Sequence, residues 1–373
     1  MKAFNRLHDD ERGFSLVFVA LGFMGFLAAS MLAIDVGMLM TARSQAQNSA
    51  DAGALAGATA LVFNDFDDRT ATGPAVTNAL AGARGNQVMS VNVNVVPSDV
   101  TFPNDPAGLP TRVKVNVFRT GARGNPVSTL IAQYFGISTA DIQATATAEA
   151  SAADSMTCVK PFTIPDRWLE NGTRGSTGDD AFTPGADVYR DPFDPNPTGY
   201  DAERDKGTLI TLKANNDSKI APSFYYPWDM DGSNRGADDY RWSIGNCNVD
   251  VMGFGQTFVA KPGNMVGPTK QGMDDLIARD PDARWDTTQN KVISTKYPSP
   301  RVVAIPLFDP VYYYEGKASG RNASLRFINY LGFFLERMSG NEVVGRITPI
   351  GGLRRGGLPA PNGAFPRVIR LVQ

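Results

Sequence analysis

Histidine and cysteine, the residues that most often carry chemistry, are nearly absent from this chain. Its 373 residues include one histidine, His8, and two cysteines, Cys158 and Cys247. A Ser-His-Asp triad would have to use His8, which lies among charged residues just ahead of a long apolar stretch. These three residues cannot supply four Cys and His ligands to a zinc ion. We therefore expect neither kind of site.

Oxygen ligands are more plentiful, and one acidic stretch could hold a hard cation such as calcium. Its candidate ligands are Asp229, Asp231, Ser233, Asp238 and Asp239. The spacing is not that of an EF-hand, because Asn234 stands where the invariant glycine belongs and Tyr240 where the final glutamate belongs. The alternative is a solvated loop whose aspartates cap turns. Calcium is the single cofactor for which the sequence offers ligands, and we expect no other.

Motifs of catalysis are missing from the sequence. It contains no G-x-S-x-G, P-loop, H-E-x-x-H or C-x-x-C pattern. The pairs Asp179-Asp180 and Asp274-Asp275 could supply two opposed carboxylates to a glycosidase, but such pairs are expected by chance among 38 acidic residues. We predict no enzymatic activity and no small-molecule substrate. The net charge of -2 and the lack of long basic runs also exclude broad attraction to nucleic acid.

An uncharged apolar run extends from Phe14 to Ile34. As a helix it would span roughly 31 Å, which matches a hydrocarbon core of about 30 Å. Small residues at 28–30 would also suit a cleaved secretory signal, but the run is longer than the usual signal core of about 7 to 15 residues. We therefore predict a transmembrane helix over 14–34.

The charges around this helix predict its orientation. Lys2, Arg6 and Arg12 precede it, and Arg43 is the one basic residue soon after it. The positive-inside rule then leaves residues 1–13 in the cytoplasm and exports the rest of the chain. In an oxidising compartment Cys158 and Cys247 would form a disulfide, closing a loop of about 90 residues and stabilising the fold by about 4 to 5 kcal/mol. Two separate buried thiols are the alternative.

Helical character continues beyond the apolar run. Residues 36–62 are rich in alanine and contain no proline, and small residues recur on one helix face. The predicted helix-packing residues are Ala42, Ala46, Ala50, Gly53 and Gly57. Gly53 and Gly57 form a small-xxx-small pair that lets another backbone approach closely. The face could pack on its own domain or against a helix of a neighbouring subunit.

The remaining sequence is rich in strand patterns. Alternation at 91–95, 113–117 and 141–150 predicts three strands, and 126–135 predicts a short helix. After Cys158, dense Gly, Pro and Asp predict long loops between strands at 208–213, 302–307, 311–314, 325–335 and 366–372, with one helix at 270–278. The fold class is therefore α+β. Beyond 1–13 and 14–34, we expect a long helix on a small antiparallel sheet over 35–156, resembling pilins in plan, and a β-rich, loop-rich domain over 157–373.

The first part of the chain resembles a known family. Its motifs are Glu11-Arg12-Gly13, Ala33-Ile34-Asp35-Val36-Gly37, Ala42-Arg43, Gln47-Asn48, Ala50-Asp51-Ala52 and Ala54-Leu55-Ala56-Gly57-Ala58. In order and spacing these are similar to the N-terminal region of TadE/TadG-like Flp pilus assembly proteins. This sequence differs from the family in two features. Phe18 stands where a pilin cut after Gly13 would carry glutamate, and residues 231–235 lack the second serine of a von Willebrand metal motif.

The resemblance implies a bacterial inner-membrane protein of the tight-adherence pilus machinery, single-pass, with its body in the periplasm. Its partners would be the inner membrane and other Flp or Tad assembly proteins involved in cell adhesion. Two alternatives stay open. One is a minor pilin-like subunit of the fibre. The other is a membrane-tethered periplasmic carbohydrate binder or hydrolase that uses the Asp-rich loops.

Overall fold

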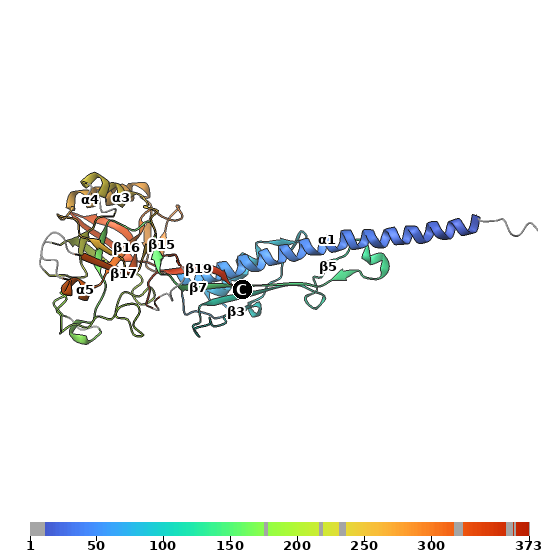
Figure 1. The fold of residues 1–373 in the computed structure, drawn as a ribbon, viewed down its shortest axis with the longest axis horizontal. Coiled ribbons are helices and arrows are strands. Elements are labelled where there is room, and N and C mark those ends of the chain that lie inside the picture. The colour runs from blue at the N-terminus through green and yellow to red at the C-terminus, as the bar shows by residue number, and fades with distance from the viewer. Residues whose placement is uncertain are drawn as a thin grey trace, which may run out of the picture. The chain divides into compact units, whose positions relative to one another are not determined.

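A computed structural model describes residues 12–174, 178–215, 219–230, 236–316, 324–355, 361 and 363–372 (Figure 1). The chain divides into two compact units. Unit 1 contains Met1–Ala58, Arg69–Glu149 and Leu371–Gln373, and unit 2 contains Thr59–Asp68 and Ala150–Arg370. The α+β fold class is confirmed, since a long helix precedes a β-rich part of the chain.

A single helix, α1 (Arg12–Phe63), runs for 52 residues. It joins the predicted transmembrane segment and the predicted alanine-rich continuation without a break, because no proline interrupts either part. The two parts differ in their surroundings. From Gly13 to Ala29 the side chains are exposed or half-buried, whereas from Asp35 onward one side of the helix is repeatedly buried.

The sheet of unit 1 is built on a long antiparallel pair. Strand β4 (Arg112–Arg119) pairs with β7 (Ile142–Ala152), from Arg112 opposite Glu149 to Arg119 opposite Ile142. The sheet order is β19-β7-β4-β3, where β3 is Val100–Thr101 and β19 is Arg367–Val372. The valines of β4 are buried and alternate with half-buried residues, as the sequence predicts. Of the strand predicted at 91–95, only β2 (Val91–Asn92) forms, paired with β1 (Gln87–Val88).

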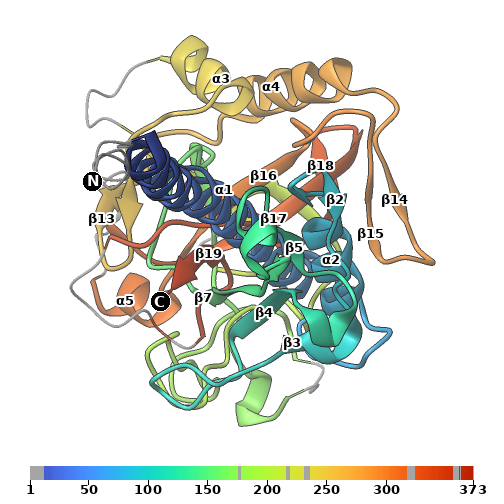
Figure 2. The same cartoon turned by 90° about the vertical axis from the view of Figure 1, so that its right-hand side faces the viewer.

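A second helix, α2 (Pro74–Arg84), packs on α1, and the sequence analysis missed it. Proline at its first turn and the alanines at 75, 79 and 83 are the signals that could have found it. Figure 2 shows α2 and β4 beside α1. The approach is close: a Cβ built at Gly57 would lie 2.8 Å from Val113 Cγ1 and 3.1 Å from Ala79 Cβ.

The helix predicted at 126–135 is wrong, because most of this segment is a hairpin. Strand β5 (Val127–Ser128) pairs with β6 (Thr139–Ala140), and a short 3-10 helix, η3 (Ala132–Phe135), lies between them. The backbone amides of Leu130, Ile131 and Ala132 bind the Asp35 carboxylate. A longer helix cannot form because these three amides already have a side-chain partner.

Unit 2 is organised around a sheet that closes on itself. The strand order is β13-β17-β16-β9-β11-β10-β18, and β17 also pairs with β18. This last pairing closes a barrel of six strands, β16, β9, β11, β10, β18 and β17, with β13 outside the ring. Strand β17 can serve several neighbours because it is 16 residues long. Large side chains that are fully buried in this unit include Phe162, Tyr225, Trp228, Phe308, Phe327, Tyr330 and Phe333.

The barrel strands are short except for β17. Their bounds are β9 (Phe162–Pro165), β10 (Leu209–Ala214), β11 (Phe224–Pro227), β16 (Val302–Phe308), β17 (Ser324–Ser339) and β18 (Glu342–Ile347), with β13 at Thr257–Val259. Two smaller pairs are β8 (Ser155–Met156) with β12 (Met252–Gly253) and β14 (Arg284–Asp286) with β15 (Lys291–Ile293). Helices α3 (Ala237–Gly245) and α4 (Val266–Arg279) contact each other. The predicted helix at 270–278 therefore exists and is longer at both ends.

The strand predicted at 311–314 is wrong. These residues belong to helix α5 (Pro310–Glu315). The Asp309 carboxylate accepts hydrogen bonds from the amides of Val311 and Tyr312 at 2.9 and 3.0 Å, and Pro310 occupies the first helical position. An aspartate cap followed by proline is a helix start, and it outweighs the β preference of valine and tyrosine.

We predict that Gly57→Leu lowers the free energy of unfolding by about 1 to 3 kcal/mol, the usual cost of overpacking a filled site. The new side chain would have to displace Val113, Ala79 and the Ala75 carbonyl. Gly37→Leu in the same helix is the matched control, because nothing lies within 4 Å of a Cβ at that position. Urea unfolding of the full chain in detergent measures both. Equal effects of the two substitutions would contradict the packing described here.

Candidate functional site

The apolar half of α1 exposes its large side chains in the part of the chain that the structure describes. Phe14, Leu21 and Phe26 are 60 to 70% exposed, at 69, 61 and 67%. The helix is long and apolar enough to cross a membrane. In water such a surface would be costly, at about 25 cal/mol per Å² of apolar area. In a bilayer the same surface is favourable.

Asp35 follows directly after this apolar run and is buried, with 4% of its surface exposed. Its carboxylate accepts hydrogen bonds from the amides of Leu130 at 2.7 Å, Ile131 at 3.0 Å and Ala132 at 2.6 Å. Burial on its own would raise the pKa of Asp35, but the hydrogen bonds from these amides outweigh it, and the net pKa is lowered. The carboxylate therefore stays ionised and holds the β5–β6 hairpin against α1.

The predicted helix-packing residues are all buried. Ala42, Ala46 and Ala50 have no exposed surface. A Cβ at Gly53 would lie 3.0 Å from Ala83 Cβ and 3.2 Å from Val115 Cγ1. Around Gly53 and Gly57 the face is thus covered by α2 and β4, so this part of it packs within unit 1.

Cys158 and Cys247 form a disulfide, with their Cα atoms 4.2 Å apart and 89 residues between them in sequence. The Lys160 ammonium reinforces this connection by donating to the carbonyls of Ile244 at 2.6 Å and Asn246 at 3.3 Å. Burial, together with the charge of Arg279, lowers the pKa of Lys160 to about 8. The start of unit 2's long segment is thereby attached to the end of α3.

Only some of the predicted calcium ligands lie at the same pocket in the structure. Asp229 and Asp239 line the same pocket, whereas Asp238 is exposed outside its lining. Asp231 and Ser233 lie outside the described residues. Among the residues that the structure describes, no group of three or more His, Cys, Asp or Glu side chains is placed to hold a metal ion. Calcium binding stays a prediction.

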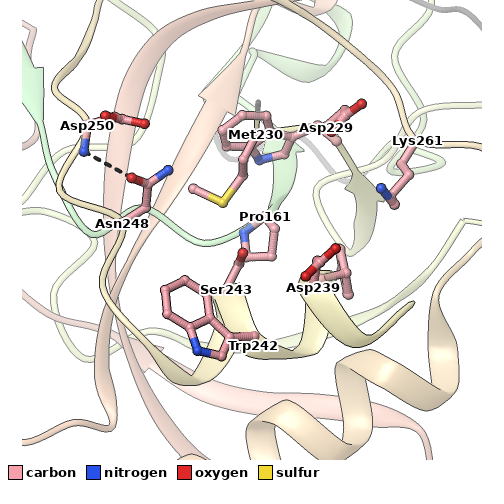
Figure 3. Close-up of a pocket in the computed structure, with 11 residues that line it drawn as sticks. Pro161, Asp229, Met230, Asp239, Trp242, Ser243, Asn248, Asp250 and Lys261 are labelled. Atoms are coloured by element: carbon pink, nitrogen blue, oxygen red, sulfur yellow. Dashed lines mark hydrogen bonds between the residues drawn. The ribbon is translucent and has the colours of Figure 1, made fainter. Parts of the chain in front are cut away.

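The pocket itself has a volume of about 220 Å³ and mixed polarity (Figure 3). Trp242, on α3, is 59% exposed, while Lys261 is only 8% exposed. Within the described chain the Lys261 ammonium has no hydrogen-bond or ion-pair partner. Asp229, Asp239 and Asp250 add carboxylate acceptors to the pocket lining. An aromatic face with one ammonium donor and several carboxylate acceptors suits a hydroxylated ligand.

Asp166 is the buried acid of unit 2 whose titration is most altered. It has no exposed surface, and burial raises its pKa to about 7 despite hydrogen bonds from the amides of Tyr200 and Arg167 and from the Tyr189 hydroxyl. Such a pKa is typical of a general acid. A substrate would have no access to this carboxyl, however, so its role is structural.

Two residues of these sites, Asp35 and Lys261, are not among the predicted site residues. Asp35 has a signal in the sequence, because it is a lone charge inside an otherwise uncharged helix face, next to the apolar run. Lys261 gives no local signal, since its burial depends on strands and loops distant in sequence.

We predict that Asp166→Asn removes a pH dependence from the stability of unit 2. An unfolded carboxyl loses its proton near 3.8, but the folded one keeps it to about 7, so stability from this group falls as pH rises between those values. The variant should lack that decline. Urea midpoints from pH 4 to 8 measure it, with the exposed Asp250→Asn as control. A decline of the same size in Asp166→Asn would contradict the assignment.

In the comparison with known proteins, the matching residues are those of α1 that carry several of these features. Residues 13–60 match the model of the Tad family, described as "Putative Flp pilus-assembly TadE/G-like". No curated protein and no solved structure matches the chain. The matched residues include the apolar half of α1, Asp35 and the small-residue face. Residues 13–60 are therefore similar to TadE/G-like Flp pilus-assembly proteins, as their motifs indicate.

Proposed function

We propose that this protein is a non-enzymatic, single-pass inner-membrane component of a Flp, or tight-adherence, pilus assembly system. The observation that carries the proposal is an overlap: the family match at 13–60 falls on the one described helix that is apolar enough to cross a membrane. The apolar half of α1 would anchor the protein in the membrane, and the packed half would connect this anchor to the rest of the protein.

The proposed topology has a cytoplasmic N-terminus and a periplasmic body. Lys2, Arg6 and Arg12 before the apolar run support it through the positive-inside rule. The disulfide supports it as well, because disulfides persist in oxidising compartments such as the periplasm. The partners would be the inner membrane and other pilus assembly proteins, with no nucleic acid and no small-molecule substrate. Because the small-residue face is already covered, protein partners must use other surfaces.

The proposal predicts that deletion of the gene abolishes piliation and surface attachment, and that anchoring is needed for rescue. Complementation with Leu21→Arg plus Met24→Arg should fail, since each arginine costs about 2.5 to 3.5 kcal/mol at the centre of a span. Met40→Arg plus Ser44→Arg should rescue, because both positions are exposed beyond Asp35. Pilus counts by electron microscopy and carbonate-washed membrane fractions are the measurements. Normal piliation in the deletion strain would refute the proposal.

A minor pilin-like fibre subunit is distinguished in the same strains. Its mature chain would begin at Phe14 and be found in sheared fibres, whereas an anchored assembly component keeps residues 1–13 and stays with the membrane. The intact mass of the protein from each fraction decides between them.

The pocket of unit 2 favours a second candidate function, the binding of a saccharide by a membrane-tethered body. Carbohydrate sites combine an aromatic face, which packs on the ring, with donors and acceptors for its hydroxyls. Trp242 supplies the exposed ring, Lys261 the donor, and Asp229 and Asp239 two acceptors (Figure 3).

This second function predicts that methyl glycosides of common hexoses and N-acetylhexosamines change the tryptophan fluorescence of the full chain. The change should be lost in Trp242→Ala and in Lys261→Met. It should persist in Lys270→Met, whose ammonium pairs with Asp274 on α4, outside the pocket lining. Isothermal titration at millimolar glycoside provides the affinity. No response to any glycoside, or a response unchanged in both pocket variants, would rule the function out.

A further inference from the structure

The turn of the β5–β6 hairpin exposes apolar side chains to an unusual degree. Its exposed residues are Leu130 (56%), Tyr134 (83%), Phe135 (46%) and Ile137 (55%), which we call the hairpin tip. No charged residue lies between Thr129 and Ser138. A contiguous exposed apolar cluster of this kind marks a surface that contacts a partner or a membrane.

The position of the tip along α1 is fixed by Asp35. The carboxylate binds the amides of Leu130, Ile131 and Ala132, which directly precede Tyr134 in the chain. Asp35 is also the residue after Ile34, where the apolar run ends. The hairpin tip therefore lies at the level of that end, and Figure 1 shows the hairpin beside α1.

Exposed apolar side chains of the helix flank the point where the hairpin is attached. Ile34 and Val36 are 47 and 40% exposed on either side of the buried Asp35. If the run 14–34 spans a bilayer, its end coincides with the layer of lipid headgroups. Tyrosine and phenylalanine favour that layer, and apolar side chains penetrate it by about 5 to 10 Å.

We propose that the hairpin tip inserts into the interfacial layer of the bilayer that α1 crosses, as a second and shallower membrane contact. The proposal rests on the proposed membrane anchoring. The attachment of the tip at Asp35, directly after the apolar run, is what favours lipid over a protein partner as the occupant. A deep contact and a shallow one together fix the rotation of α1 about its axis and prevent the helix from sliding along its length. Asp35 acts as the positioning residue for the tip.

The test uses the full chain, reconstituted without reductant so that Cys158 and Cys247 stay paired. A nitrobenzoxadiazole fluorophore is attached to Tyr134→Cys, to Leu21→Cys in the apolar run, or to Ala122→Cys, which is exposed at the base of the hairpin. The vesicles contain phosphatidylcholine and phosphatidylglycerol, with spin labels either at headgroup depth or near the bilayer centre. Quenching by each label reports depth.

We expect the Tyr134→Cys probe to be blue-shifted and quenched by the headgroup-depth label, and the Ala122→Cys probe to show neither effect. Strong quenching at Leu21→Cys by the central label shows that α1 spans. Quenching at Leu21→Cys without quenching at Tyr134→Cys overturns the inference and leaves the anchoring intact. Absence of quenching at Leu21→Cys refutes the anchoring itself. A blue shift at Tyr134→Cys that neither lipid label quenches indicates a protein occupant and also overturns the inference.

The positioning role is tested by Asp35→Ala in the Tyr134→Cys background. Without the carboxylate the hairpin is no longer held to the helix, so headgroup-depth quenching should fall toward the Ala122→Cys value while quenching at Leu21→Cys is unchanged. Asp51→Ala is the matched control in the same helix, because Asp51 contacts Gln47 and not the hairpin. Protease resistance of each variant verifies that the body is folded. Equal quenching in both aspartate variants, with the body intact, would remove the positioning role.

Discussion

The structure of unit 1 depends on how closely α1 can approach α2 and β4. A Cβ at Gly82 would lie 2.8 Å from the Ala52 carbonyl oxygen and 2.8 Å from Ala56 Cβ, so the two helices meet almost backbone to backbone. Because the side chains at this contact are small, it gains little from the burial of any one of them and relies on many dispersion contacts at short range. The distance between α1 and α2, and with it the position of β4, depends on the absence of larger residues on this face.

Unit 2 is held together differently, because it contains long loops and few long strands. Closure through β17 and β18 removes most exposed strand edges, and the aromatic core fills the ring. Arg301 shows how the loops are secured. This residue is 3% exposed, and its guanidinium donates to the carbonyls of Leu335, Asp280 and Ala283. One buried cation thus satisfies carbonyls from two segments that are distant in the sequence.

The parts of the fold that the sequence predicted are those with a strong local period. The apolar run and the alanine-rich helix follow from composition and spacing, and β4 and β7 from alternation. Strand β9 and the pairing of β10 with β18 have no local signal, because they depend on contacts between residues more than a hundred positions apart. At the candidate sites, the cysteine pair was predictable from the expected oxidising compartment and from the presence of two cysteines. The burial of Lys261 without a partner among the described residues, and the binding of three amides by Asp35, could not be predicted, because tertiary contacts alone create them.

The two units are not consecutive in the chain. Thr59–Asp68 belongs to unit 2, yet Arg69–Glu149 of unit 1 follows it before the rest of unit 2 begins. During synthesis from the N-terminus this short segment emerges long before the barrel that Arg367 and Lys206 help it join, through contacts to Phe66 and to the carbonyls of Phe63 and Asn64. Unit 2 therefore cannot be completed from its C-terminal part alone. The contact between Phe66 and Arg367 can form only after nearly all of the chain has been synthesised.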